Sequence, residues 1–165
     1  MNHLPHRPLD LDDPAELQAH ADLISRVFLM PRATDAAREE RRQRMHGERV
    51  SVVEDGQTLV ATFRSWDSQM SVPGGGSVPV NAVSGVVVSP THRRRGLLRD
   101  WLTSDLHQAQ SAGMVASVLW ASEATIYGRY GFGPLTAQTT LTLDLARGGF
   151  AGPASGSLEA IGLDG

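Results

Sequence analysis

Apolar and polar positions follow two different periods along the chain, and the change comes near residue 49. Before that point the spacing is helical. Asp13-Pro14 combines an N-cap residue with a proline at the first helical position, and Leu17, Ala21 and Ile24 recur after it, which predicts a helix over 14–28. The charged stretch 34–46 predicts a second helix, whose charges more simply form a solvated face than a binding patch.

After residue 49 the pattern favours strands. Runs rich in Val, Thr and aromatic residues at 49–54 and 58–66 flank Asp55-Gly56, which is a strong signal for a β-hairpin. The hairpin arm, or a short additional strand, leads through a glycine-rich turn into a long strand over 77–89. These segments predict an antiparallel meander.

The remaining chain mixes strands and helices. The apolar run 83–88 predicts a fully buried strand that Pro90 ends, and the apolar positions from Leu98 onwards predict a helix over 97–112 before Gly113. A strand over 115–121, a short helix over 123–129 and a strand over 136–145 are expected next. The fold class is therefore α/β, with a mixed, mostly antiparallel central sheet flanked by helices.

The length of 165 residues suits one globular domain. We expect this domain over residues 1–145. Residues 146–165 have the glycine- and alanine-rich composition of a linker.

The segment Pro90-Thr91-His92-Arg93-Arg94-Arg95-Gly96 is the most informative part of the sequence, because it joins a strand to a helix. The first amides of a helix have no intrahelical acceptor and lie at the positive end of its macrodipole. Glycine lets a phosphate approach the backbone closely. The segment therefore predicts an anion site suited to the pyrophosphate of an extended ligand. The alternative is a solvated basic turn.

Composition excludes several kinds of chemistry. All 15 basic side chains are arginine, and cysteine is absent. Without lysine there is no Walker-type phosphate loop and no side-chain Schiff base, and without cysteine there is no thiol nucleophile, disulfide or Cys-bound zinc. The net charge of −3 gives no electrostatic case for nucleic acid, and no apolar run approaches membrane-spanning length. We expect a cytoplasmic protein with neither a nucleic-acid nor a membrane partner.

The histidines give no sign of a metal centre. His46, His92 and His107 lack partners at a metal-binding spacing, so we expect surface histidines and no bound metal. The Gly-x-Ser-x-Gly elbow of hydrolases is also missing.

The pattern Val-x-Val-x-Pro-x-x-Arg-x-x-Gly, which ends at Gly96, resembles motif A of the GNAT acetyltransferases. The family pattern Gln/Arg-x-x-Gly-x-Gly/Ala maps onto Arg93, Gly96 and Leu98, where leucine replaces the small residue. Together with Trp120-Ala121-Ser122-Glu123 and the segment 126–133, the loop is similar to the enhanced intracellular survival (Eis) branch of that family. The resemblance implies the GNAT acyl-CoA N-acyltransferase fold.

The resemblance also implies an activity: direct transfer of acetyl from acetyl-CoA to a primary amine of a small polycationic acceptor, such as an aminoglycoside. Tyr127 matches the general acid of the family. The backbone at 86–88 would meet the pantetheine arm of the coenzyme, and the loop would hold its pyrophosphate. The residues assigned to coenzyme binding are Val86, Val87, Val88, Arg93, Arg94, Arg95, Gly96, Leu97, Leu98, Ser122 and Glu123.

The general base and the extent of the protein stay open. In the Eis branch the base is the terminal carboxylate of a longer chain, whose second GNAT-like domain and sterol-carrier-like domain we expect to lie outside this sequence. Glu123 is an alternative base, although capping a helix is the simpler role for it. The branch forms hexamers, which we expect here only with the downstream domains. The same motifs also fit a CoA-binding module, or a fragment, without independent turnover.

Overall fold

The computed structural model describes residues 4–137, 139, 140 and 142. The chain divides into two units, 1–133 and 134–165, and the fold is that of the first unit. Its elements, in chain order, are β1 (His6–Pro8), α1 (Pro14–Val27), α2 (Asp35–Met45), β2 (Arg49–Asp55), β3 (Thr58–Val72), β4 (Gly76–Val88), the 3-10 turn η1 (Pro90–His92), α3 (Leu97–Ser111), β5 (Ala116–Leu119) and the 3-10 turns η2 (Ala124–Ile126) and η3 (Gly128–Tyr130).

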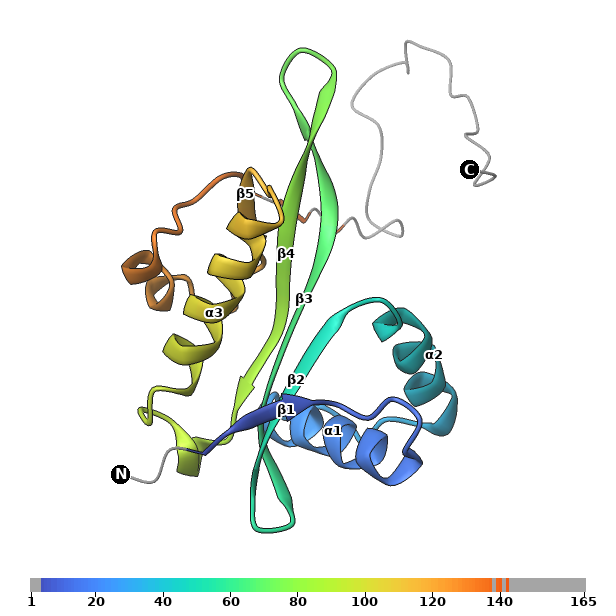
Figure 1. Ribbon diagram of the computed structural model, residues 1–165. Coiled ribbons are helices and arrows are strands. Elements are labelled where there is room, and N and C mark those ends of the chain that lie inside the picture. Colours follow the sequence, from blue (N-terminus) through green and yellow to red (C-terminus); the bar gives the residue numbers. More distant parts are fainter. Residues whose placement is uncertain (1–3, 138, 141, 143–165) are drawn as a thin grey trace, which may run out of the picture. The chain divides into compact units, whose positions relative to one another are not determined.

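A five-stranded sheet in the order β1-β2-β3-β4-β5 forms the centre of the unit (Figure 1). The first four strands pair antiparallel, as the meander predicts. β5 lies parallel to β4, because the chain crosses between them through α3. The tight turn at Asp55-Gly56 joins β2 to β3, and Gly56 adopts a φ of +65° there. The mixed, mostly antiparallel sheet is thus confirmed.

Helices cover both faces of the sheet (Figure 1). On one face, Leu23 of α1 and Met45 of α2 pack with Val52 in a buried apolar cluster. On the other face, Trp101 and Leu102 of α3 are buried in a second cluster. α1 and α3 therefore each turn an apolar stripe towards the sheet, whereas α2 buries only Met45, and the sheet is the middle layer of three.

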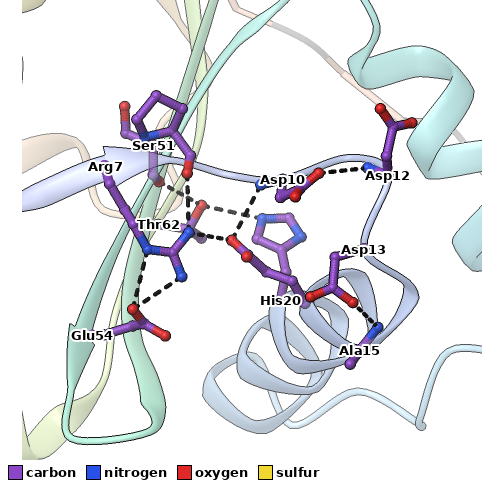
Figure 2. Close-up of polar contacts among 11 residues, drawn as sticks. Arg7, Asp10, Asp12, Asp13, Ala15, His20, Ser51, Glu54 and Thr62 are labelled. Atoms are coloured by element: carbon purple, nitrogen blue, oxygen red, sulfur yellow. Dashed lines mark hydrogen bonds and ion pairs between the residues drawn. The ribbon is translucent and has the colours of Figure 1, made fainter.

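Polar contacts at the N-terminal end of α1 fix its position against the sheet. The Asp13 carboxylate caps the helix by accepting from the Ala15 amide at 2.8 Å, as the sequence predicts. The Arg7 guanidinium donates both to Glu16 Oε1 at 2.5 Å and to Glu54 Oε2 at 3.1 Å, and so joins β1 to α1 and β2 (Figure 2).

None of the helices in the described part of the chain is long and apolar enough to cross a membrane.

His20, in the middle of α1, is buried with 3% of its surface exposed. Its Nε2 lies 3.1 Å from Thr62 Oγ1, and the Thr62 hydroxyl donates to the Ser51 carbonyl at 3.1 Å (Figure 2). Because that hydroxyl proton is already used, His20 Nε2 must carry the proton of the His20–Thr62 bond. The ring is therefore assigned as the neutral tautomer with an unprotonated Nδ1.

The later elements differ in part from those that the sequence predicts. The strand expected to be fully buried at 83–88 is only partly so, because Val86 and Val88 are half-buried beyond the last residue that pairs with β5. The short helix expected over 123–129 is instead two 3-10 turns, since Gly128 interrupts a segment too short for an α-helix. Half of the residues of the strand expected over 136–145, and the domain boundary at 145–146, lie outside the described residues, and residues 136, 137, 139, 140 and 142 form no strand.

Candidate functional site

A bulge in β4 changes the direction of its side chains next to the anion loop. Thr62 pairs with Val87 but Arg64 pairs with Ser84, so β4 contains one more residue than β3 over this stretch. Gly85, within the bulge, has a φ of +59° that favours glycine. The bulge therefore sets the orientation of the last strand residues before the loop.

β4 and β5 separate directly beyond their paired segment. Four residue pairs join them, ending with Val83 and Leu119, and no further pair joins the two strands in the described part of the chain. The backbone at 84–88 is thus paired with β3 on one side and open towards β5 on the other. An extended ligand arm with amide groups fits such an opening, because it can continue the hydrogen bonding of the strand.

The loop after β4 presents a row of free amides. Among the residues that the structure describes, no carbonyl or side chain accepts a hydrogen bond from the amides of 93–99. α3 begins at Leu97 with Gly96 as its N-cap, as predicted, so the last of these amides belong to the first helical turn. Free amides at the positive end of a helix form a cradle for an anion.

The backbone of the loop is held in an uncommon conformation. Arg94 has a φ of +64° and Gly96 a φ of +88°, both in the left-handed region. A methyl group at Gly96 would lie 3.2 Å from the Arg99 guanidinium and 3.6 Å from the Asp100 carboxylate. Arg93, Arg94 and Arg95 are exposed around it and supply positive charge, whereas the Leu97 and Leu98 side chains pack against the apolar cluster on the α3 face.

Tyr127 lies between η2 and η3, after the open end of β5. Its ring is half-buried, packs against the cluster on the α3 face, and meets the Phe132 ring edge-on with 6.0 Å between centroids. Burial, with smaller contributions from Glu123 and Tyr130, raises the pKa of the Tyr127 phenol above its usual 10. The hydroxyl is therefore protonated at neutral pH and able to donate a proton.

Ser122 and Glu123 lie in the exposed segment between β5 and Tyr127. Glu123 occupies the N-cap position of η2, but its carboxylate makes no capping hydrogen bond, so the capping role expected for it is wrong. Glu123 does act on Tyr127 electrostatically, because its negative charge disfavours the phenolate.

His92 is not the surface histidine that its sequence context suggests. It is buried, with 9% of its surface exposed. Its Nε2 lies 2.9 Å from Asp55 Oδ2 at the β2–β3 turn, and its Nδ1 lies 2.8 Å from Thr91 Oγ1. Sequence spacing could not reveal this pair, because the two residues are 37 positions apart and meet only when the hairpin turn reaches the loop.

Comparison with known proteins gives one consistent result. Residues 11–135 match the family described as "Acetyltransferase (GNAT) domain". An uncharacterized N-acetyltransferase of Streptomyces avermitilis is 46% identical over 106 residues, which are 62% of this chain and 25% of that protein. The N-acetyltransferase Eis of Mycobacterium tuberculosis is 42% identical over 90 residues, which are 54% of this chain and 22% of that protein.

A solved structure agrees with the sequence relatives. Eis1 from Mycobacterium abscessus superposes with a TM-score of 0.64 and 30% identity, over 79% of this chain and 31% of that one. The chain thus spans about a quarter of the length of the curated relatives that it matches.

Proposed function

The chain belongs to the GNAT acetyltransferase family, and from this membership we propose that it transfers an acetyl group from acetyl-CoA directly to a primary amine. The observation that carries the proposal is the row of free amides at the start of α3, beside the opening between β4 and β5. The two features together suit a ligand with an anionic group at one end and an extended, amide-containing arm at the other.

The fit to coenzyme A follows the chemistry of each part. The amides of 93–98 would bind the pyrophosphate, and the exposed guanidinium groups of Arg93, Arg94 and Arg95 would balance its charge. The open backbone at Val86–Val88 would bind the pantetheine arm, with Ser122 and Glu123 on the β5 side. When bound, acetyl-CoA supplies an activated acetyl thioester.

Tyr127 is the proposed general acid. As the amine nitrogen forms a bond to the acetyl carbon, the carbon–sulfur bond breaks and the sulfur needs a proton. The Tyr127 hydroxyl supplies this proton, and its raised pKa keeps the hydroxyl protonated at neutral pH. The amine must itself be neutral to attack, so its proton leaves to solvent or to a carboxylate, for which Glu123 is the candidate.

The acceptor that we propose is a small polycationic amine of the aminoglycoside type. The support is the 42% identity to Eis over 90 residues. The acceptor remains a proposal, since the matched segment is 22% of that relative.

Replacing Tyr127 with phenylalanine tests the proposal. The variant keeps the ring packing and loses only the proton donor, so we expect kcat to fall about 100-fold while CoA affinity is unchanged. Thiol release from acetyl-CoA with an aminoglycoside gives kcat, and calorimetry gives the dissociation constant of CoA. Tyr130→Phe is the matched control, because it removes the hydroxyl of a neighbouring tyrosine in the same cluster.

Two outcomes would contradict the proposal in different ways. Equal kcat in wild type and Tyr127→Phe would remove Tyr127 from the mechanism. A wild-type chain that binds CoA tightly but releases no thiol with any amine would instead be a coenzyme-binding module.

A further inference from the structure

The anion loop, residues 90–96, has a backbone conformation that several of its own features disfavour. Arg94 lies in the left-handed region, which costs a non-glycine residue about 1–2 kcal/mol. Arg93, Arg94 and Arg95 are adjacent like charges, and the amides of 93–98 make no hydrogen bond within the described part of the chain. Each of these features favours rearrangement of the loop when no anion is bound.

The contacts that oppose this rearrangement are few. The Ser89 amide donates to the Val60 carbonyl at 2.7 Å and fixes the end of β4 to β3. The His92 amide donates to the Ser89 carbonyl at 2.8 Å and closes η1. Beyond η1, the guanidinium contacts of Arg93 and Arg95 are to carbonyls of Val88 and Thr91, so they stay within the same segment.

The His92 side chain supplies the long-range contact. It is the one buried residue between Ser89 and Gly96, and it links the loop to Asp55 at the β2–β3 turn. A carboxylate only accepts hydrogen bonds, so Nε2 carries a proton and donates to Asp55. In the neutral ring Nδ1 then accepts from the Thr91 hydroxyl. Asp55 thus fixes both the orientation and the tautomer of the ring.

We infer that His92, oriented by Asp55, is the positioning residue that keeps the loop in its coenzyme-binding conformation. The inference rests on the proposed function, because it assigns this pair to the coenzyme site. Apparent affinity falls in proportion to the fraction of molecules whose loop is ready to bind. Loss of the pair lowers that fraction, although neither side chain needs to touch the coenzyme.

Calorimetric titration with CoA tests the inference on the 165-residue chain. We compare wild type with Asp55→Ala, Asp55→Asn, His92→Ala and the double variant Asp55→Ala/His92→Ala, and we record the unfolding midpoint of each without ligand. A lost hydrogen bond to a charged group predicts CoA binding about tenfold weaker in Asp55→Ala and in His92→Ala. Asp55→Asn should bind nearly as wild type, because its amide oxygen still accepts from Nε2.

Non-additivity is the second expectation. Because Asp55 acts through His92, the double variant should bind CoA no more weakly than His92→Ala alone. Glu54→Ala is the matched control, since this neighbouring carboxylate bonds to Arg7 rather than to the loop, and it should leave CoA affinity unchanged. If His92→Ala does not fold, Asp55→Ala carries the test, because its carboxylate is 53% exposed.

The outcomes separate the two proposals. If Asp55→Ala lowers the unfolding midpoint but binds CoA as wild type does, the pair is only structural and the inference is wrong. If Asp55→Asn binds as weakly as Asp55→Ala, the hydrogen-bond role of Asp55 is wrong. If wild type does not bind CoA, the proposed function falls and this inference falls with it.

Discussion

At the scale of single residues, we expect Gly96 to control whether an anion can reach the loop amides. Alanine at this position would adopt the left-handed φ of +88° at a cost of about 1–2 kcal/mol, and its methyl group would lie 3.2 Å from the Arg99 guanidinium. We expect Gly96→Ala to bind CoA about tenfold more weakly, equivalent to about 1.4 kcal/mol, as measured by calorimetry.

Gly113 offers a matched control at the other end of α3. It has a similar φ of +78°, and an added methyl group there would meet nothing within 4 Å. Gly113→Ala should therefore lose a similar amount of stability but no CoA affinity. Equal CoA affinities in the two variants would show that the cradle does not bind the coenzyme.

At the scale of elements, Asp105 holds α3 against two strands. The buried carboxylate accepts from Ser65 Oγ of β3 at 2.5 Å and from Asn81 Nδ2 of β4 at 2.6 Å. The Arg49 guanidinium donates to both Ser65 and Asn81, so the network reaches β2. Removal of the Asp105 carboxylate takes away the buried acceptor of the Ser65 hydroxyl and of Asn81 Nδ2, which costs more than the lost bonds alone.

Asp105→Ala should consequently lower the free energy of unfolding by about 3 kcal/mol. Urea denaturation measures this loss, and Thr103→Ala, an exposed position on the same helix, is the control that should change little. A loss of the same small size in both variants would mean that the network does not fix α3.

Local signals explain which elements the sequence predicted. Asp13-Pro14 and Asp55-Gly56 act on the backbone directly next to them, so the start of α1 and the β2–β3 turn could be located without other segments. β1 was missed because His6-Arg7-Pro8 has no strand pattern of its own and is ordered by pairing with β2. The His92–Asp55 pair was missed for the same reason: its partner comes from a distant segment.

The features of the candidate site also differ in whether they depend on local sequence or on distant segments. The anion loop could be predicted because a strand, a glycine and a helix follow each other directly in sequence. The bulge at Gly85 and the separation of β4 from β5 could not, since both depend on register between strands. Tyr127 was identified by resemblance alone, and its role stays a prediction.

At the scale of the whole unit, His20 makes stability depend on pH. Burial, with the nearby charges of Arg41 and Arg64, lowers the pKa of His20 from 6.5 to about 4. The neutral ring therefore stabilises the fold above pH 6.5, and this contribution is lost as pH falls towards 4. A shift of that size corresponds to about 3 kcal/mol.

Urea denaturation at pH 7.5 and pH 4.5 measures the effect. Wild type should lose about 2–3 kcal/mol through His20 between these values, and His20→Leu should lack that part of the pH dependence. His107→Leu, at an exposed position on α3, should keep it. Identical pH profiles for His20→Leu and wild type would show that the buried ring is not the titrating group.

Apart from His92 with Asp55, the ion pairs of the described fold are built on guanidinium groups, for example Arg7 with Glu16 and Arg64 with Glu48. A bound acyl thioester is an acylating reagent, and it can react with nearby lysine side chains. Acylation of a lysine removes its positive charge. A guanidinium remains protonated and escapes that damage. Because none of the 15 basic side chains is lysine, the proposed donor has no side-chain amine of this chain to modify.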